Sequence, residues 1–240
     1  MPLATHTSLV LARFEQIRDT GTVSEVWPSG TLFWRAGADV RAGNSSAKEQ
    51  RAFKFVLLGL HESEASAREA VAGRNAAAPW LADAMETFAA VLQPFRHYGE
   101  ANFVEQEAPG PLFEVSEATP DEDTPIVILT SVGWSRYDEE AIARIKRFSE
   151  GVAAVRIGMT GLPGLHSQQT FSFPGGLEWD GLTVTFWRDL ASAMAFAYGP
   201  GFHRSQVKLQ REGPYGDRTS FTRFVALHRE GTWHGSDPFD

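Results

Sequence analysis

The strongest constraint on the fold of this chain is a set of local signals that occurs twice. The segment SEASA at residues 63–67 recurs as DLASA at residues 189–193. Gly73 likewise recurs as Gly199. Both recurrences have the same offset of 126 residues, from 63 to 189 and from 73 to 199. A constant offset between similar segments indicates a duplicated structural unit.

Each copy carries the signals that begin and end a helix. Ser63 and Asp189 can cap a helix by accepting a hydrogen bond from an exposed backbone N–H of the first turn. Gly73 and Gly199 can end the helix in the left-handed conformation. Apolar stretches typical of strands precede the caps, at residues 53–60 and 182–187. The order strand, cap, helix, glycine therefore occurs twice.

The rest of the chain supplies further strands and helices. Aliphatic and β-branched residues predict strands at residues 8–14, 126–131 and 221–227. In the second half, Ile142, Ile145 and Phe148 recur every three residues and predict a helix over residues 138–148, after which residues 152–157 return as a strand. The resulting order of strand, helix, strand, strand, helix, strand is that of a ferredoxin-like unit. We therefore predict an α+β fold with two ferredoxin-like modules in tandem.

The two modules are separated by a segment with little periodic signal. Residues 105–125 contain four prolines and seven acidic residues, which indicates a surface crossing. We place the boundary near residue 120, so that the modules span residues 1–120 and 121–240. In the first module, Pro79 can begin a further helix with an apolar stripe. Its members are Leu81, Met85, Phe88 and Leu92. Polar or turn residues predict long loops at residues 35–50 and 161–181.

Composition excludes several classes of protein. The chain has 30 acidic and 22 basic residues, and no run of Lys or Arg that could follow a phosphate backbone, so we expect no nucleic-acid partner. No apolar stretch approaches the roughly 20 residues of a membrane span. The first residues lack the basic head and apolar core of a signal peptide. These observations predict a cytoplasmic location.

The chain contains no cysteine, which limits its metal chemistry. Disulfides, cysteine-ligated zinc, iron–sulfur clusters and thiolate-ligated haem are excluded together. No pair of the seven histidines has the short helical spacing of a zinc protease site. Any metal must therefore be bound by His, carboxylate, Tyr or Met.

Short segments along nearly the whole chain resemble the spheroidene monooxygenase family, whose members are haem-dependent oxygenases. In the second half the resembling segments are Arg156–Gly158, Gly161–Pro163, Thr185–Phe186, Asp189, Phe196–Ala197, His203, Arg223–Phe224, Glu230–Trp233 and Gly235–Pro238. In the first half they are Phe33–Trp34, Ala67–Glu69 and Leu92–Pro94. None of them is a catalytic motif alone, so their order and spacing carry the resemblance.

This resemblance implies a pseudo-dimeric α+β barrel, in which the sheets of the two modules face one another within one chain. It also implies a b-type haem in the second module, with its iron bound by a histidine on a late helix. His203 lies where the family has that histidine, and neutral imidazole suits iron. Arg204 adjoins it and can pair with a haem propionate. The alternative for His203 is a partly exposed histidine on a helix that forms hydrogen bonds with solvent.

The resemblance suggests roles for five further residues. Arg156 and Arg223, at predicted strand positions, can hold haem propionates through charge-assisted hydrogen bonds, although surface positions at strand ends would serve equally. Arg144 can reach the distal side from the preceding helix. His166 can act as a distal acid–base residue, and Gln168 as a polar group of a distal loop, with a flexible loop as the alternative for both.

The leading functional hypothesis is a haem-dependent monooxygenase that acts on a small apolar molecule in carotenoid or other secondary-metabolite biosynthesis. It requires molecular oxygen and an electron donor. Two alternatives remain open. One keeps the haem for a dehydration or rearrangement, and the other is a cofactor-free barrel monooxygenase or small-ligand-binding protein. The oligomeric state stays open, because an intrachain pseudo-dimer neither needs nor forbids dimerisation.

Overall fold

The computed structural model describes residues 2–19, 27–39, 51–101, 103–104, 110–116, 119–135, 138–173, 181–199 and 216–240. The strands are β1 (His6–Asp19), β2 (Thr31–Asp39), β3 (Arg51–His61), β4 (Glu86–Gly99), β5 (Ile126–Gly133), β6 (Leu165–Ser172), β7 (Gly181–Trp187) and β8 (Arg218–Gly231). The helices are α1 (Glu64–Ala72), α2 (Arg74–Ala77), the 3₁₀ helix η1 (Pro79–Asp83), α3 (Glu139–Met159) and α4 (Leu190–Tyr198). None of these helices is both long and apolar enough to cross a membrane.

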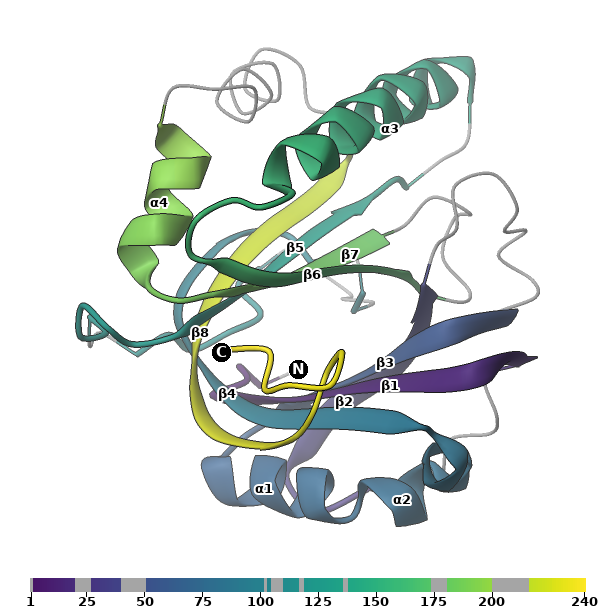
Figure 1. The fold of residues 1–240 in the computed structure, drawn as a ribbon, viewed down its shortest axis with the longest axis vertical. Coiled ribbons are helices and arrows are strands. Elements are labelled where there is room, and N and C mark those ends of the chain that lie inside the picture. Colours follow the sequence, from purple (N-terminus) through teal and green to yellow (C-terminus); the bar gives the residue numbers. More distant parts are fainter. Residues whose placement is uncertain are drawn as a thin grey trace.

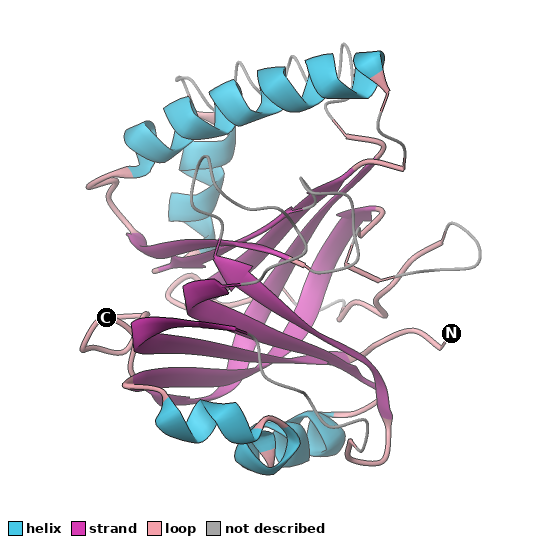
Figure 2. Cartoon of the chain, turned by 90° about the vertical axis from the view of Figure 1, so that its right-hand side faces the viewer, coloured by secondary structure: helices cyan, strands magenta, loops and turns pink. Residues whose placement is uncertain are grey.

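The strands close into one antiparallel barrel in the order β1-β3-β2-β6-β7-β5-β8-β4 (Figure 1). Strands β1–β4 form the first half and β5–β8 the second. The halves meet along the whole length of the β4–β8 pair. At the other junction, β2 and β6 pair only through Ala38 with Ser172 and Asp39 with Phe171. Figure 2 shows helices on both outer sides of the barrel. The predicted α+β barrel of ferredoxin-like modules is confirmed.

The second half has the complete predicted order of β5, α3, β6, β7, α4 and β8. The first half differs, because the described residues contain no helix between β1 and β2. Among the described residues, the helices of the first half are α1, α2 and η1, and none of them corresponds to α3. The module boundary near residue 120 stays a prediction, since the crossing between β4 and β5 belongs to neither set of strands.

Several local predictions are wrong. Residues 35–39 of the predicted loop at residues 35–50 belong to β2. Residues 152–157 continue α3 instead of forming a strand, and residues 165–172 form β6 within the predicted loop. Pro79 begins only η1, after which Phe88 and Leu92 lie in β4. Residues four apart in the sequence point to the same side in a helix and also in a strand, so this spacing does not distinguish the two. Arg156 consequently lies on a helix.

The two repeated caps form as predicted, but the glycines act differently. Ser63 accepts from the backbone N–H of Ser66, and Asp189 from that of Ser192. Gly73 and Gly199 end α1 and α4 with φ of −85° and −64°, which is not the left-handed conformation. At Gly199 a side chain is excluded by space instead, since a Cβ there would clash with the preceding helical turn.

The barrel interior is a packed aromatic and aliphatic core. The ring of Phe186 makes edge contacts with Phe88 and Phe239, at centroid distances of 5.6 and 5.3 Å. Phe239 and Trp233 belong to the C-terminal tail, and Phe113 to the crossing between the halves. Both segments thus complete the core of the barrel, which fastens the C-terminus to the fold.

Candidate functional site

Two rows of residues give the outer face of the second half a polar character. Directly paired residues of antiparallel strands point to the same side, so the register defines each row. The first row runs Gln168, Thr185, Ile128, Arg223 across β6, β7, β5 and β8. The second runs Thr170, Thr183, Thr130, Phe221 across the same strands. Six of these eight residues are polar, the exceptions being Ile128 and Phe221, and we call the set the polar belt. It faces the helices, because Trp187 on the same side of β7 packs against Phe196 of α4.

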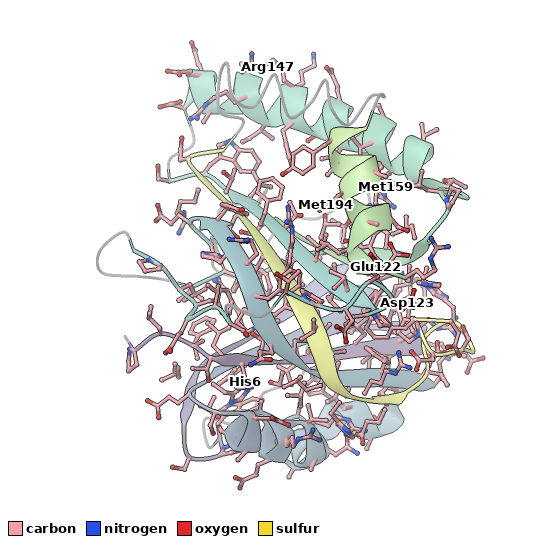
Figure 3. All side chains as sticks on the ribbon, turned by 90° about the vertical axis from the view of Figure 1, so that its left-hand side faces the viewer. His6, Glu122, Asp123, Arg147, Met159 and Met194 are labelled. Carbon is pink, nitrogen blue, oxygen red and sulfur yellow. The ribbon has the colours of Figure 1, made fainter. Side chains whose placement is uncertain are left out.

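Helix α3 crosses this face and is anchored at its two ends. At its N-terminal end, Ala141 and Ile145 are buried against β5 and the residues that follow it. At its C-terminal end, Met159 is buried in a second cluster that includes Trp187, near Met194 of α4 (Figure 3). Val152, in the middle of the helix, belongs to neither cluster. Nearer the middle of the helix, Phe148 and Val155 are only partly buried against these two clusters.

Partly buried apolar side chains of the sheet, α3 and α4 lie around the second cluster. Eight apolar side chains pack around the second cluster but are only partly buried: Ile128, Val155, Leu162, Leu165, Leu190, Met194, Phe196 and Val225. They come from the sheet, from α3 and from α4, so one planar ligand could bury members of all three layers. Haem has that shape. His203 and Arg204, its predicted ligand and neighbour, lie outside the described residues.

Two predicted residues occupy the same row of the polar belt. Arg223 and Gln168 are three strand spacings apart, about 14 Å. The guanidinium of Arg223 lies 6.0 Å from the ring centre of Tyr98 on β4. Gln168 and Arg223 therefore mark two sides of the face on which a planar ligand would lie.

Arg156 meets Gln168 at a cleft beside the β2–β6 junction. The cleft has a volume of about 140 Å³ and is lined by Asp39, Lys54, Arg156, Gln168, Gln169 and Thr170. We call it the junction cleft. The sequence analysis missed Lys54, although a lysine that alternates with Val56 and Leu58 in an apolar strand is a signal that a charge points into the barrel.

The predicted catalytic residue Arg144 is held by another contact. Its Nη1 lies 2.7 Å from the Oδ1 of Asp217, whose Oδ2 accepts hydrogen bonds from the backbone N–H and hydroxyl of Ser135. Burial alone would raise the pKa of Asp217, but these hydrogen bonds and the charge of Arg144 lower it. Arg144 lies about 18 Å along α3 from Arg156. The structure does not bring these two arginines together.

His166 lies at the start of β6, where the register with β7 shifts between Leu165 and Ser167. Its Nε2 is buried and has no hydrogen-bond partner among the described residues. A buried nitrogen without a partner is costly, so it is available for a ligand group. Within the described ranges, no three His, Asp or Glu residues are grouped to hold a metal ion. A haem iron needs only one axial ligand from the chain.

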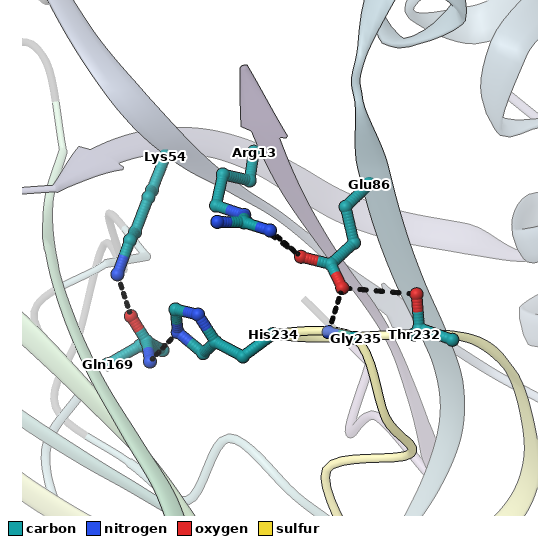
Figure 4. Close-up of polar contacts among 7 residues, drawn as sticks. All are labelled: Arg13, Lys54, Glu86, Gln169, Thr232, His234 and Gly235. Atoms are coloured by element: carbon teal, nitrogen blue, oxygen red, sulfur yellow. Dashed lines mark hydrogen bonds and ion pairs between the residues drawn. The ribbon is translucent and has the colours of Figure 1, made fainter. Parts of the chain in front are cut away.

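A second set of polar residues lies at one end of the barrel, next to the junction cleft (Figure 4). Glu86 binds Arg13 at 2.8 Å and accepts from the backbone N–H of Gly235 and from Thr232 in the C-terminal tail. These bonds lower the pKa of Glu86 although burial opposes them. Glu86 therefore ties the tail to β1 and β4.

Gln169 connects this end of the barrel to the cleft. Its Oε1 accepts from the Nζ of Lys54 at 3.1 Å, and its Nε2 lies 3.5 Å from the Nε2 of His234. Burial lowers the pKa of Lys54; the charge of Asp39 opposes this effect and those of Arg13 and Arg156 add to it. Lys54 is thus a positioned, partly desolvated cation.

A curated relative aligns with most of this chain. Spheroidene monooxygenase of Rhodobacter capsulatus is 30% identical over an alignment of 190 residues, which covers 77% of this chain and 71% of that protein. The chain belongs to the spheroidene monooxygenase family. This relationship supports an oxidoreductase of the monooxygenase type and confirms the resemblance seen in the sequence. No protein-family model matches the chain.

Solved structures support the fold. An aldoxime dehydratase superposes with a TM-score of 0.62 at 10% identity, over 98% of this chain and 87% of its own. A second aldoxime dehydratase structure, determined with butyraldoxime, has the same TM-score and identity and is covered to 85%. At this identity the likeness concerns the fold alone.

Proposed function

We propose that this chain is a haem-dependent monooxygenase that acts on a small apolar molecule, in carotenoid or other secondary-metabolite biosynthesis. The single observation that carries the proposal is the group of partly buried apolar side chains contributed by the sheet, α3 and α4, in a member of the spheroidene monooxygenase family. Haem b bound against these side chains would supply the activation of molecular oxygen, with electrons from an external donor.

The chain's own residues would bind and orient the reactants. His203 is the residue that would bind the haem iron, and Arg204 adjoins it in the sequence. The apolar side chains of α3 and α4 would exclude water, and the belt would present hydroxyl, amide and guanidinium groups to one face of the ligand. Arg156 and Arg223 lie towards opposite sides of the belt, whereas both propionates leave one edge of a haem. We therefore expect only one of these arginines to hold propionates.

The first test is the visible absorption spectrum of the full chain after haem addition. We expect a Soret band in the wild type and its loss or shift in His203→Ala. His228→Ala is the control, because His228 lies in β8 at the molecular surface. A wild-type chain that stays colourless with added haem would refute the haem proposal and favour a cofactor-free protein. The packed barrel interior argues against a site of that kind inside the barrel.

A haem-dependent dehydration or rearrangement is the second candidate, and the likeness in fold to aldoxime dehydratase motivates it. Turnover separates the two. Monooxygenation consumes oxygen and electrons from a donor, whereas dehydration consumes neither overall. Substrate loss that continues without oxygen and without sustained electron supply would favour the second candidate.

A further inference from the structure

The junction cleft lies where the barrel closes with the fewest strand pairs. Only two residues of β2 pair with β6. Residues 165–170 of β6 therefore have no described strand paired with them on that side. The cleft beside them draws its lining from β2, β3, β6 and α3. It is therefore built jointly by the two halves.

The charges of the cleft favour one bound negative charge. Lys54 and Arg156 contribute two positive charges and Asp39 one negative charge, so the lining carries a net charge of +1. The nearby Arg13 and Glu86 form an ion pair and cancel. Arg156 makes no ion pair with any residue that the structure describes. A monoanion would neutralise the lining and separate two cations that repel each other.

The donors of the cleft are positioned from two directions. Gln169 holds the Nζ of Lys54 at 3.1 Å, and the ring of Trp233 lies 5.9 Å from the same atom. Gln168 and Thr170, on the opposite side of β6, add amide and hydroxyl groups. The Oδ1 of Asp39 is buried without a hydrogen-bond partner among the described residues, and a water or hydroxyl that accompanies the anion would satisfy it.

We infer that the junction cleft binds a carboxylate group, held by Lys54 and Arg156. Ammonium and guanidinium donors around a small polar space suit the two oxygens of a carboxylate. The carboxylate has two possible sources. One is a propionate of haem, because Gln168 and Thr170 are also the β6 ends of the polar belt, and this source rests on the proposed function. The other is a free small carboxylate, which does not.

The cleft itself is tested with free propionate and the full chain without haem. NMR would follow the side-chain amides of Gln168 and Gln169 during a propionate titration, with uncharged propionamide as the control ligand. We expect saturable shifts with propionate alone, and about tenfold weaker binding in Lys54→Met or Arg156→Gln, equivalent to about 1.4 kcal/mol. Lys146→Met, at an exposed position on α3, is the matched control. Shifts absent in the wild type, or unchanged in both cleft variants, would overturn the inference.

The source is tested with haem and haem dimethyl ester, which lacks free carboxylates. If a propionate occupies the cleft, Lys54→Met weakens haem binding about tenfold and leaves the binding of the ester unchanged. If haem affinity is unchanged but propionate still binds in a Lys54-dependent way, the cleft takes a free carboxylate. Propionate binding in a chain that binds no haem would sustain this inference while the proposed function fails. Because Arg156 is exposed, Arg156→Gln keeps the test valid should Lys54→Met not fold.

Discussion

The two halves of the barrel share one repeated motif, but the helix of this motif is buried to different extents in the two halves. In the first half, α1 lies on the sheet through small residues, and Ala67, Ala70 and Val71 are all buried. At the equivalent position in the second half, α4 buries only Ala193. Among the described residues, the cluster of the first layer has 14 buried residues and four partly buried ones, Trp27, Trp34, Ala84 and Leu227, whereas that of the second has five buried residues and eight partly buried ones. The described part of the duplicated fold is therefore packed more completely in the first half than in the second.

Apolar side chains that stay partly exposed contribute less to the stability of the fold, and a bound ligand that covers them can restore this contribution. Burial of apolar surface contributes about 25 cal/mol per Å², so half-buried side chains on three neighbouring elements forfeit stability unless something covers them. The proposed function uses the partly exposed apolar side chains and the polar belt, both of which lie in this second half.

Matched phenylalanine truncations in the two helix layers should give the largest difference. Phe55 is fully buried between Phe14 and Trp80, at centroid distances of 5.6 and 5.4 Å, so Phe55→Ala should lower the free energy of unfolding by about 3–5 kcal/mol. Phe196 on α4 is partly exposed, so Phe196→Ala should cost about 1 kcal/mol in the chain without haem. Urea unfolding measures both. Equal losses in the free energy of unfolding would show that the second layer is packed as tightly as the first.

The halves also differ at the last residue of equivalent strands, where His61 corresponds to Trp187 at the offset of 126 residues, from 61 to 187. His61 is fully buried, with its Nε2 at 2.8 Å from the hydroxyl of Ser8 and its Nδ1 at 3.1 Å from that of Ser66. Burial, with a smaller effect from the charge of His6, lowers the pKa of His61 to about 4. The folded state therefore holds a neutral histidine.

This burial predicts a loss of stability in acid. The unfolded chain takes up a proton near pH 6.5, whereas the folded chain resists until about pH 4. The free energy of unfolding should thus fall by about 3 kcal/mol as the pH drops between these values. His61→Gln should flatten this slope in urea unfolding at several pH values, and His228→Gln should leave it unchanged. An unaltered slope in His61→Gln would mean that other groups cause it.

Local signals in the sequence were sufficient for most strands and both repeated caps. Ser63 and Asp189 form the caps that their residue types predict, because capping depends only on the next few residues. The continuation of α3 was missed, since β-branched Val152, Val155 and Ile157 have strand propensity. Helix packing overrides that propensity, because Val155 and Met159 pack in the second cluster and continue the stripe begun by Ile145 and Phe148.

The candidate site was predictable only in part. Gln168 and Arg223 share one face of the sheet. They lie in one row only because of the register of four strands, which the sequence does not reveal. The junction cleft was not foreseen, because Asp39, Lys54 and Arg156 are far apart in the sequence and meet only where the barrel closes. Pairing between β2 and β6 joins the two halves, and no local pattern encodes it. The roles of His203 and Arg204 stay predictions.

The smallest expected difference concerns the two helix caps. Asp189 accepts from the backbone N–H of Ser192 at 2.6 Å and from the guanidinium of Arg188 at 2.7 Å, whereas Ser63 accepts, among the described residues, from the backbone N–H of Ser66 alone, at 3.2 Å. Asp189→Ala should therefore cost about 2 kcal/mol and Ser63→Ala about 1 kcal/mol in urea unfolding.

The caps should also differ in their response to acid. The hydrogen bond from Ser192, followed by that from Arg188, lowers the pKa of Asp189 to about 2. The stabilisation is therefore complete above the unfolded pKa of about 4 and is lost as the pH falls towards 2, while the hydroxyl of Ser63 does not titrate. The cost of Asp189→Ala should shrink over that range and the cost of Ser63→Ala should stay constant. If both costs were independent of pH, the Asp189 cap would act through hydrogen-bond geometry alone, and the two halves would be equivalent at this position.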